Sequence, residues 1–163
     1  METQKQNLFL LEDNSTSAAR IEDFLEKKYK DYLSITTFDN VNDLLKSINL
    51  DTVIVLLDDD LKGENGTIIL QQIKKINANT EVIIFSSDDN VATAIDAYRK
   101  GAKSFVSKNK NTFFRIQAII SSIVYYPAII IQRFFGLKEL LSIFIVEILY
   151  IIIFVLVGYQ ILF

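Results

Sequence analysis

The chain has 163 residues, half of them hydrophobic, and a formal net charge of −3 at pH 7. This length suits one domain with a full hydrophobic core and a modest extension. The chain contains no cysteine and no histidine, which excludes disulfides, thiolate metal sites, imidazole bases and phosphohistidine within these residues. Any metal site must therefore use oxygen ligands, and the acidic balance argues against nucleic-acid binding.

Charge and hydropathy divide the chain into two parts. Residues 1–112 contain 14 basic and 18 acidic side chains, a net charge of −4, whereas residues 113–163 have a net charge of +1. The segment 140–163 is almost continuously apolar. A polar domain followed by an apolar tail is the first prediction.

Strand and helix patterns alternate along the polar part. An apolar strand is predicted over 7–11, and polar side chains in 14–17 can cap the helix that follows it. A β-branched strand over 33–38 precedes a helix over 41–48 with apolar residues at i, i+3, i+4 and i+7. These segments predict two successive βα units.

Three more βα units follow. The most apolar strand, 52–57, ends at three aspartates, and a glycine-containing loop leads into a helix with its apolar stripe over 69–76. A strand over 81–85 precedes a helix that ends at Lys100–Gly101 and whose apolar positions are Val91, Ala94, Ile95 and Tyr98. A brief strand over 104–106 precedes a helix over 112–126.

Five βα units in succession predict an α/β fold with a mainly parallel sheet, covered by helices on both faces and joined by right-handed crossovers. In open sheets of this kind, the functional crevice lies at the carboxyl ends of the strands. The residues that directly follow each strand are therefore the candidates for function.

Chemically active side chains follow four of these strands: Glu12 and Asp13 the first, Asp58 the third, Ser86 the fourth and Lys108 the fifth. Carboxylates gathered at one edge raise one another's pKa, and a divalent cation such as Mg²⁺ relieves their repulsion. Lys108 and Ser86 are suited to bind the oxygens of a phosphoryl group, while one carboxylate acts as nucleophile to form an acyl phosphate.

This order of residues resembles the receiver domain of two-component response regulators over about residues 7–125. The matching motifs are Glu12–Asp13, the run 58–61 with Gly66 eight residues after Asp58, Ser86–Ser87, and the run 101–108. The resemblance implies a flavodoxin-like, doubly wound five-stranded parallel sheet with strand order 2-1-3-4-5.

The resemblance also implies roles. Asp58 would be the phosphoacceptor, assisted by Ser86 and Lys108, and Ser86 and Phe105 would form a switch. The Mg²⁺ ligands would be Glu12, Asp13, Asp58 and the backbone carbonyl of Asp60. The protein is then expected to receive a phosphoryl group from a histidine kinase or phosphotransfer protein, and to be a phosphoacceptor that assists its own phosphorylation and dephosphorylation rather than an enzyme.

Each residue also has a simpler interpretation. An acid after a strand often only caps the next helix, which for Asp13 alone is the favoured interpretation. The run Asp58–Asp60 could be a solvated turn, and Phe105 could simply pack. Lys62 and Asn109 stand where the family has proline, which favours the alternative function, a phosphorylation-independent interaction scaffold at a membrane.

The apolar tail leads to a separate expectation. We expect a receiver domain at 1–126, an apolar or interfacial linker at 127–139, and a hydrophobic helix at 140–163 that anchors the protein in a membrane. The basic residues before this helix place the domain on the cytoplasmic face. The alternatives are a packed soluble helix, a membrane hairpin that includes 116–135, and a piece of a longer membrane sensor. The expected partners are thus the kinase, a downstream protein, membrane lipid and a second copy of the chain, but no nucleic acid.

Overall fold

The computed structural model describes residues 5–61, 65–124 and 147–152. The chain divides into two compact units, Gln4–Ser121 and a second unit made of Met1–Thr3 and Ser122–Phe163. Five strands alternate with five helices between residues 6 and 124. The strands are β1 (Gln6–Leu11), β2 (Leu33–Phe38), β3 (Thr52–Asp58), β4 (Glu81–Ser86) and β5 (Ser104–Ser107). The helices are α1 (Ser15–Tyr29), α2 (Val41–Ser47), α3 (Gly66–Ile76), α4 (Val91–Arg99) and α5 (Thr112–Val124).

The sheet confirms the predicted α/β fold class. All its strand pairs are parallel, and the order is β2-β1-β3-β4-β5. Leu11 pairs with Leu57, Asp58 with Phe85, and Ser86 with Ser107. This register brings the carboxyl ends of the four strands β1, β3, β4 and β5 to one edge, where the candidate residues were expected.

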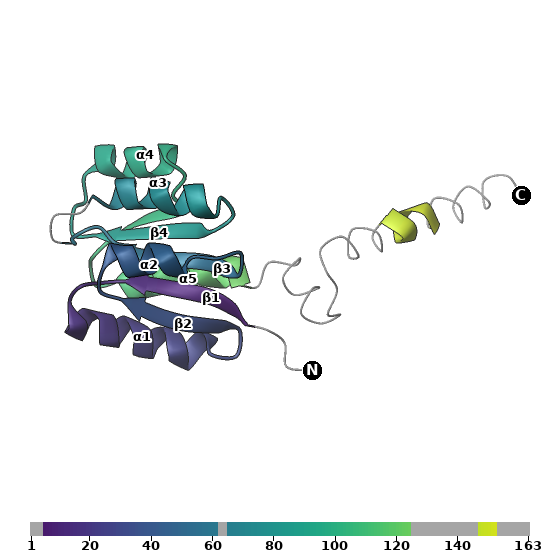
Figure 1. Ribbon diagram of the computed structural model, residues 1–163, viewed down its shortest axis with the longest axis horizontal. Coiled ribbons are helices and arrows are strands. Elements are labelled where there is room, and N and C mark those ends of the chain that lie inside the picture. Colours follow the sequence, from purple (N-terminus) through teal and green to yellow (C-terminus); the bar gives the residue numbers. More distant parts are fainter. Residues whose placement is uncertain (1–4, 62–64, 125–146, 153–163) are drawn as a thin grey trace, which may run out of the picture. The chain divides into compact units, whose positions relative to one another are not determined.

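Helices cover both faces of the sheet (Figure 1). On one face, the Tyr29 hydroxyl of α1 donates to the Gln117 carbonyl of α5 at 3.0 Å, and Phe24 and Phe113 pack with their ring centroids 5.3 Å apart. Helices α2, α3 and α4 lie on the other face, where α3 contacts both of its neighbours. The predicted two-sided covering is therefore confirmed.

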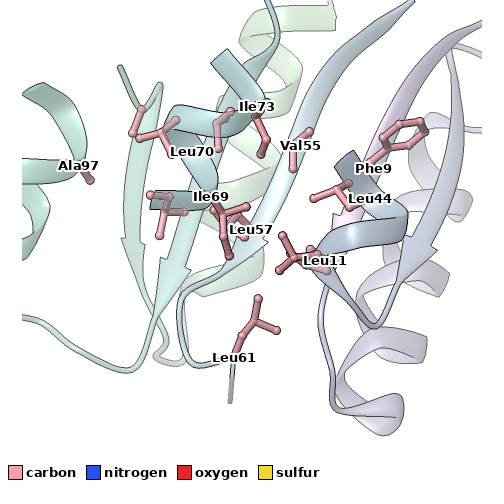
Figure 2. Packing of buried hydrophobic residues seen from close by; sticks show 14 of the residues in the cluster. Phe9, Leu11, Leu44, Val55, Leu57, Leu61, Ile69, Leu70, Ile73 and Ala97 are labelled. Carbon is pink, nitrogen blue, oxygen red and sulfur yellow. The ribbon is translucent and has the colours of Figure 1, made fainter. Parts of the chain in front are cut away.

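Strand alternation explains how the core divides between these faces. Phe9 and Leu11 face the layer of α2 and α3, together with Val55 and Leu57 of the neighbouring strand (Figure 2). The next positions along β1, including Leu8 and Leu10, are also fully buried but lie outside this cluster. The central strands are thus apolar on both sides, which explains their continuous hydrophobic runs.

The helix ends follow the predicted capping residues. Asn14 caps α1 by accepting hydrogen bonds from the amides of Thr16 and Ser17. Gly101 has a positive φ of 97° and lets the Ala102 amide reach the Ala97 carbonyl at 3.0 Å, which ends α4 in a Schellman-type turn.

The apolar stripe of α4 points outward. Val91, Ile95 and Tyr98 are 70, 46 and 51% exposed, and Ala97 is the residue of this helix that is fully buried. The spacing therefore identified the helix, but it did not identify the face that packs against the sheet.

The expected membrane-anchored location was wrong. No helix in the described part of the chain is long and apolar enough to cross a bilayer. Within 140–163 the structure describes a helical segment at 147–152. The predicted linker 127–139 and the rest of the 140–163 segment lie outside the described residues.

Candidate functional site

A buried ion pair lies at the carboxyl edge of the sheet. Asp58 is the last residue of β3, and its side chain is only 3% exposed. The Lys108 ammonium donates to both of its carboxylate oxygens, at 2.6 and 2.8 Å, and lies 5.1 Å from the centroid of the Phe85 ring. The sheet therefore brings together two residues that are 50 positions apart in the sequence.

Hydrogen bonds fix the loop that presents Lys108. The Lys108 amide donates to the Ser86 carbonyl at 2.7 Å, which extends the pairing of β4 and β5 beyond the last strand residues. The Asn109 amide donates to the Thr112 hydroxyl at 2.6 Å, and that hydroxyl lies 3.1 Å from the Ser107 carbonyl. Lys108 thus reaches Asp58 although asparagine follows it.

The Asp60 carboxylate lies beside this pair and accepts several hydrogen bonds. Lys108 donates to it at 2.7 Å, the Ser87 hydroxyl at 2.7 Å, and the Ser87 amide at 3.0 Å. The Ser86 hydroxyl donates to it at 3.4 Å. The Asp60 amide in turn donates to Asp58 at 2.9 Å, so that these residues form one connected group.

Asp59, between these two acids, has a different role. Its carboxylate accepts a hydrogen bond from the Gly66 amide at 3.0 Å, at the start of α3. A Cβ on Gly66 would lie only 2.2 Å from that carboxylate oxygen, so this close approach requires glycine. The three consecutive aspartates therefore serve two sites, since Asp58 and Asp60 contact Lys108 while Asp59 contacts Gly66.

The acids after β1 complete the edge. Glu12 is 3% exposed, and its carboxylate accepts hydrogen bonds from the Asn14 amide at 3.0 Å and from the Ser17 hydroxyl at 2.7 Å. Asp13 is exposed. Glu12, rather than Asp13, is thus the acid that the fold holds in place near the start of α1.

The electrostatics of the site indicate two neighbouring buried carboxylates. The pKa of Asp58 is raised to about 6, chiefly because burial disfavours its charged form and in part by a hydrogen bond with the Glu12 carboxyl, against the lowering effect of Lys108 and the Asp60 amide. For Asp60, burial is outweighed by the hydrogen bonds from Lys108 and Ser87, so its pKa is lowered. Burial also opposes the charge of Lys108, but its hydrogen bonds to the two aspartates raise its pKa.

Metal binding was expected at this edge. The described residues contain no group of three or more carboxylates close enough together to hold a metal ion. The donor chemistry nevertheless fits Mg²⁺, because Glu12 and Asp58 are buried neighbouring carboxylates whose repulsion a hard cation would relieve. The predicted contributions of Asp13 and of the Asp60 backbone carbonyl stay predictions.

Phe105 lies in β5 and is 7% exposed within the hydrophobic core. Its amide donates to the Tyr98 hydroxyl at 3.3 Å, which connects β5 to the exposed side of α4. The backbone of β5 is thus connected to α4 at Phe105, and the role of Phe105 as a switch stays a prediction.

The sequence interpretation assigned no contacts to the Asp60 side chain or to the Ser87 hydroxyl. It gave Asp60 a metal-binding backbone carbonyl, and it included Ser87 as part of the Ser86–Ser87 motif. Residues 59 and 60 lie beyond the end of β3, so strand alternation does not indicate which way their side chains point.

Comparison with known proteins identifies the family. The family model of the response regulator receiver domain matches residues 8–120. The Fimbriae Z protein of Salmonella typhimurium is 33% identical over 78 residues, which cover 46% of this chain and 37% of that protein. The transcriptional regulator NtrC of Klebsiella pneumoniae is 35% identical over 77 residues, covering 47% of this chain and 16% of that protein. The matched segment is thus well under half of the length of either relative.

Among solved structures, the CheX–CheY–BeF3–Mg²⁺ complex from Borrelia burgdorferi is similar to this chain, with a TM-score of 0.63 and 20% identity. The match covers 72% of this chain and 88% of that one, and at this identity it supports the fold alone. The family match, the strand order and the group around Asp58 agree, and the chain belongs to the response regulator receiver domain family.

Proposed function

We propose that the protein is a phosphoacceptor that receives a phosphoryl group on Asp58 from a histidine kinase or phosphotransfer protein. The observation that carries this proposal is the contact of Lys108 with both carboxylate oxygens of Asp58, next to the hydroxyl of Ser86. Receiver domains in general are phosphoacceptors rather than classical enzymes. Since these 163 residues contain no histidine, the phosphohistidine donor must lie outside them.

The proposed step is a nucleophilic displacement at phosphorus. A carboxylate oxygen of Asp58 forms the new P–O bond while the P–N bond of the phosphohistidine breaks, and the electron pair of that bond leaves with the imidazole nitrogen. Lys108 is 28% exposed, and it lines a pocket together with residues that include Ser17, Arg20 and Asn109. Lys108 and Ser86 would stabilise the negative charge on the transferred oxygens.

Mg²⁺ belongs to this proposal. Glu12 and Asp58 would hold the ion, which would neutralise charge on the phosphoryl oxygens when bound. The fit of these two buried carboxylates supports this assignment, and a solved structure of similar fold contains both BeF3 and Mg²⁺.

The output of the protein would be a protein–protein surface around α4 and β5. Val91, Ile95 and Tyr98 expose apolar side chains along one side of α4, and Tyr98 is hydrogen-bonded to the backbone of β5. An exposed apolar stripe at helical spacing is typical of a surface that binds a partner.

One observation favours a second candidate, the phosphorylation-independent scaffold. The Asp60 carboxylate already satisfies Lys108, Ser86 and Ser87 without a phosphoryl group. A domain with these contacts could present the same surface whether or not Asp58 is modified.

Phosphorylation by acetyl phosphate separates the two candidates. With Mg²⁺ and acetyl phosphate, acetate leaves as the phosphoryl group bonds to Asp58, so the intact protein should gain the mass of one acid-labile phosphoryl group. Asp58→Asn should gain none. Asp59→Asn is the matched control, because Asp59 contacts Gly66 rather than Lys108, and it should be modified like the wild type. Modification that persists in Asp58→Asn, or its absence in the wild type, would overturn the phosphoacceptor proposal.

A further inference from the structure

The Asp60 carboxylate has contacts that resemble those of a bound anion. It accepts hydrogen bonds from an ammonium, a backbone amide and a serine hydroxyl at 2.7 to 3.0 Å, and from a second hydroxyl at 3.4 Å. These donors come from Lys108, Ser86 and Ser87, on two different loops, and converge on one side chain. Such a set of donors is suited to an oxyanion.

The same donors surround the carboxylate that would carry the phosphoryl group. Lys108 donates to Asp58 as well as to Asp60, and the Ser86 hydroxyl lies at the end of the strand next to β3. A phosphoryl group on Asp58 would place new anionic oxygens among these donors. They would need the ammonium, amide and hydroxyl groups that Asp60 already uses.

The number of available hydrogens makes this a competition. A lysine ammonium has three N–H donors, and Lys108 contacts three oxygens, two of Asp58 and one of Asp60. The Ser87 amide has a single hydrogen, which is directed at Asp60. A phosphoryl oxygen can therefore gain full use of these donors only when the Asp60 carboxylate gives them up.

We propose that Asp60 is an internal competitor of the phosphoryl group, a carboxylate that occupies the oxyanion-binding donors and must be displaced when Asp58 is modified. This inference rests on the proposed phosphoacceptor function and adds a specificity-determining residue to it. Removal of the carboxylate should strengthen the binding of phosphoryl analogues at Asp58. In the wild type, a ligand binds fully only to those molecules in which Asp60 has released the donors, and this lowers its apparent affinity.

Beryllofluoride with Mg²⁺ is the probe, because it binds a carboxylate non-covalently as a phosphoryl analogue. Binding to the full chain would be followed by ¹⁹F NMR in the wild type, Asp60→Asn and Asp60→Ala. We expect both variants to reach half-saturation at about tenfold lower beryllofluoride concentration than the wild type. The Asp60→Ala variant controls for a new hydrogen bond that the asparagine amide of Asp60→Asn could donate to the ligand.

Asp88→Asn is the matched control for charge. Asp88 is an exposed acid close to Ser86 in sequence, but its carboxylate accepts from the Asn90 amide and the Thr93 hydroxyl rather than from Lys108. Its neutralisation should change the half-saturation by less than about twofold, as expected for an exposed charge. An equal effect of Asp88→Asn would show general repulsion and overturn the proposal.

The remaining outcomes separate this inference from the proposed function. If the wild type and both Asp60 variants bind beryllofluoride equally, or the variants bind it more weakly, the competition is refuted while the phosphoacceptor function stands. If none of the three binds it, the phosphoacceptor function itself fails, and the competition fails with it.

Discussion

The two halves of the carboxyl edge are built differently. At β3, β4 and β5, the side chains of Asp58, Asp60, Ser86 and Lys108 form one hydrogen-bonded group in which every acid has a cation beside it. At β1, Glu12 is directed toward α1 and accepts from an amide and a hydroxyl, and the described part of the chain contains no ion pair to its carboxylate. In one half, two carboxylates thus share a single ammonium, whereas in the other half the described residues place no ammonium or guanidinium on the buried Glu12 carboxylate.

The two halves are therefore suited to bind groups of opposite charge. The half around Lys108 contains the donors that an oxyanion needs, and these donors are held by the backbone of two strand ends. The half around Glu12 contains the negative charge that a cation needs, and it is held by the start of a helix. The proposed site therefore has its anion-binding and cation-binding groups on opposite sides of Asp58.

Removal of Lys108 should have the largest effect on folding. Lys108→Met leaves the Asp58 carboxylate, 3% exposed, without its cation, and we expect the free energy of unfolding to fall by about 2 kcal/mol, less than for a fully buried pair because Lys108 is partly exposed. Urea unfolding without Mg²⁺ measures the change. Lys103→Met is the control, since Lys103 pairs with Glu81 at 3.0 Å on the surface. Equal losses in the two variants would show that the group around Asp58 is not specially stabilised.

Most residues at the carboxyl edge could be predicted from the sequence, because apolar runs that stop at polar residues mark strand ends. The predicted strands 33–38 and 52–57 agree with β2 and with β3 to within one residue, and the parallel topology then brings Asp58, Ser86 and Lys108 to the same edge. Helical spacing was less informative for α4, where Val91 is exposed and Ala97 is buried. A spacing defines a stripe, but which side of the helix is covered depends on its tertiary neighbours.

The side-chain contacts could not be predicted in the same way. The run of three aspartates does not indicate that the middle one contacts Gly66 while its neighbours contact Lys108. The direction of each side chain depends on the backbone conformation after the end of β3. The role of Asp60 depends on a loop 26 residues away, where Ser86 and Ser87 lie. Long-range pairing of loops is set by the register of the sheet rather than by local pattern.

Mg²⁺ affinity should distinguish the two acids after β1. Glu12→Gln removes charge from a buried side chain, and we expect Mg²⁺ binding to weaken by about tenfold. Asp13→Asn removes charge from an exposed side chain, and we expect a smaller loss. Isothermal titration of the metal-free protein with MgCl₂ measures both. A larger loss for Asp13→Asn would reverse the assignment and make the exposed acid the principal ligand.

The smallest expected effect concerns the contact that positions Glu12. Ser17→Ala removes the hydroxyl that donates to the Glu12 carboxylate at 2.7 Å, and the loss of one hydrogen bond to a charged group should cost about 1.5 kcal/mol of unfolding free energy. Because the Asn14 amide still donates to Glu12, the carboxylate should stay in place, and Mg²⁺ affinity should fall less than it does in Glu12→Gln. Thr16→Ala is a matched control, since the Thr16 amide contacts Asn14 and survives the change. If Ser17→Ala lowers Mg²⁺ affinity as much as Glu12→Gln does, then the hydroxyl itself orients the metal-binding carboxylate, and the β1 half of the edge is as dependent on side-chain contacts as the half around Lys108.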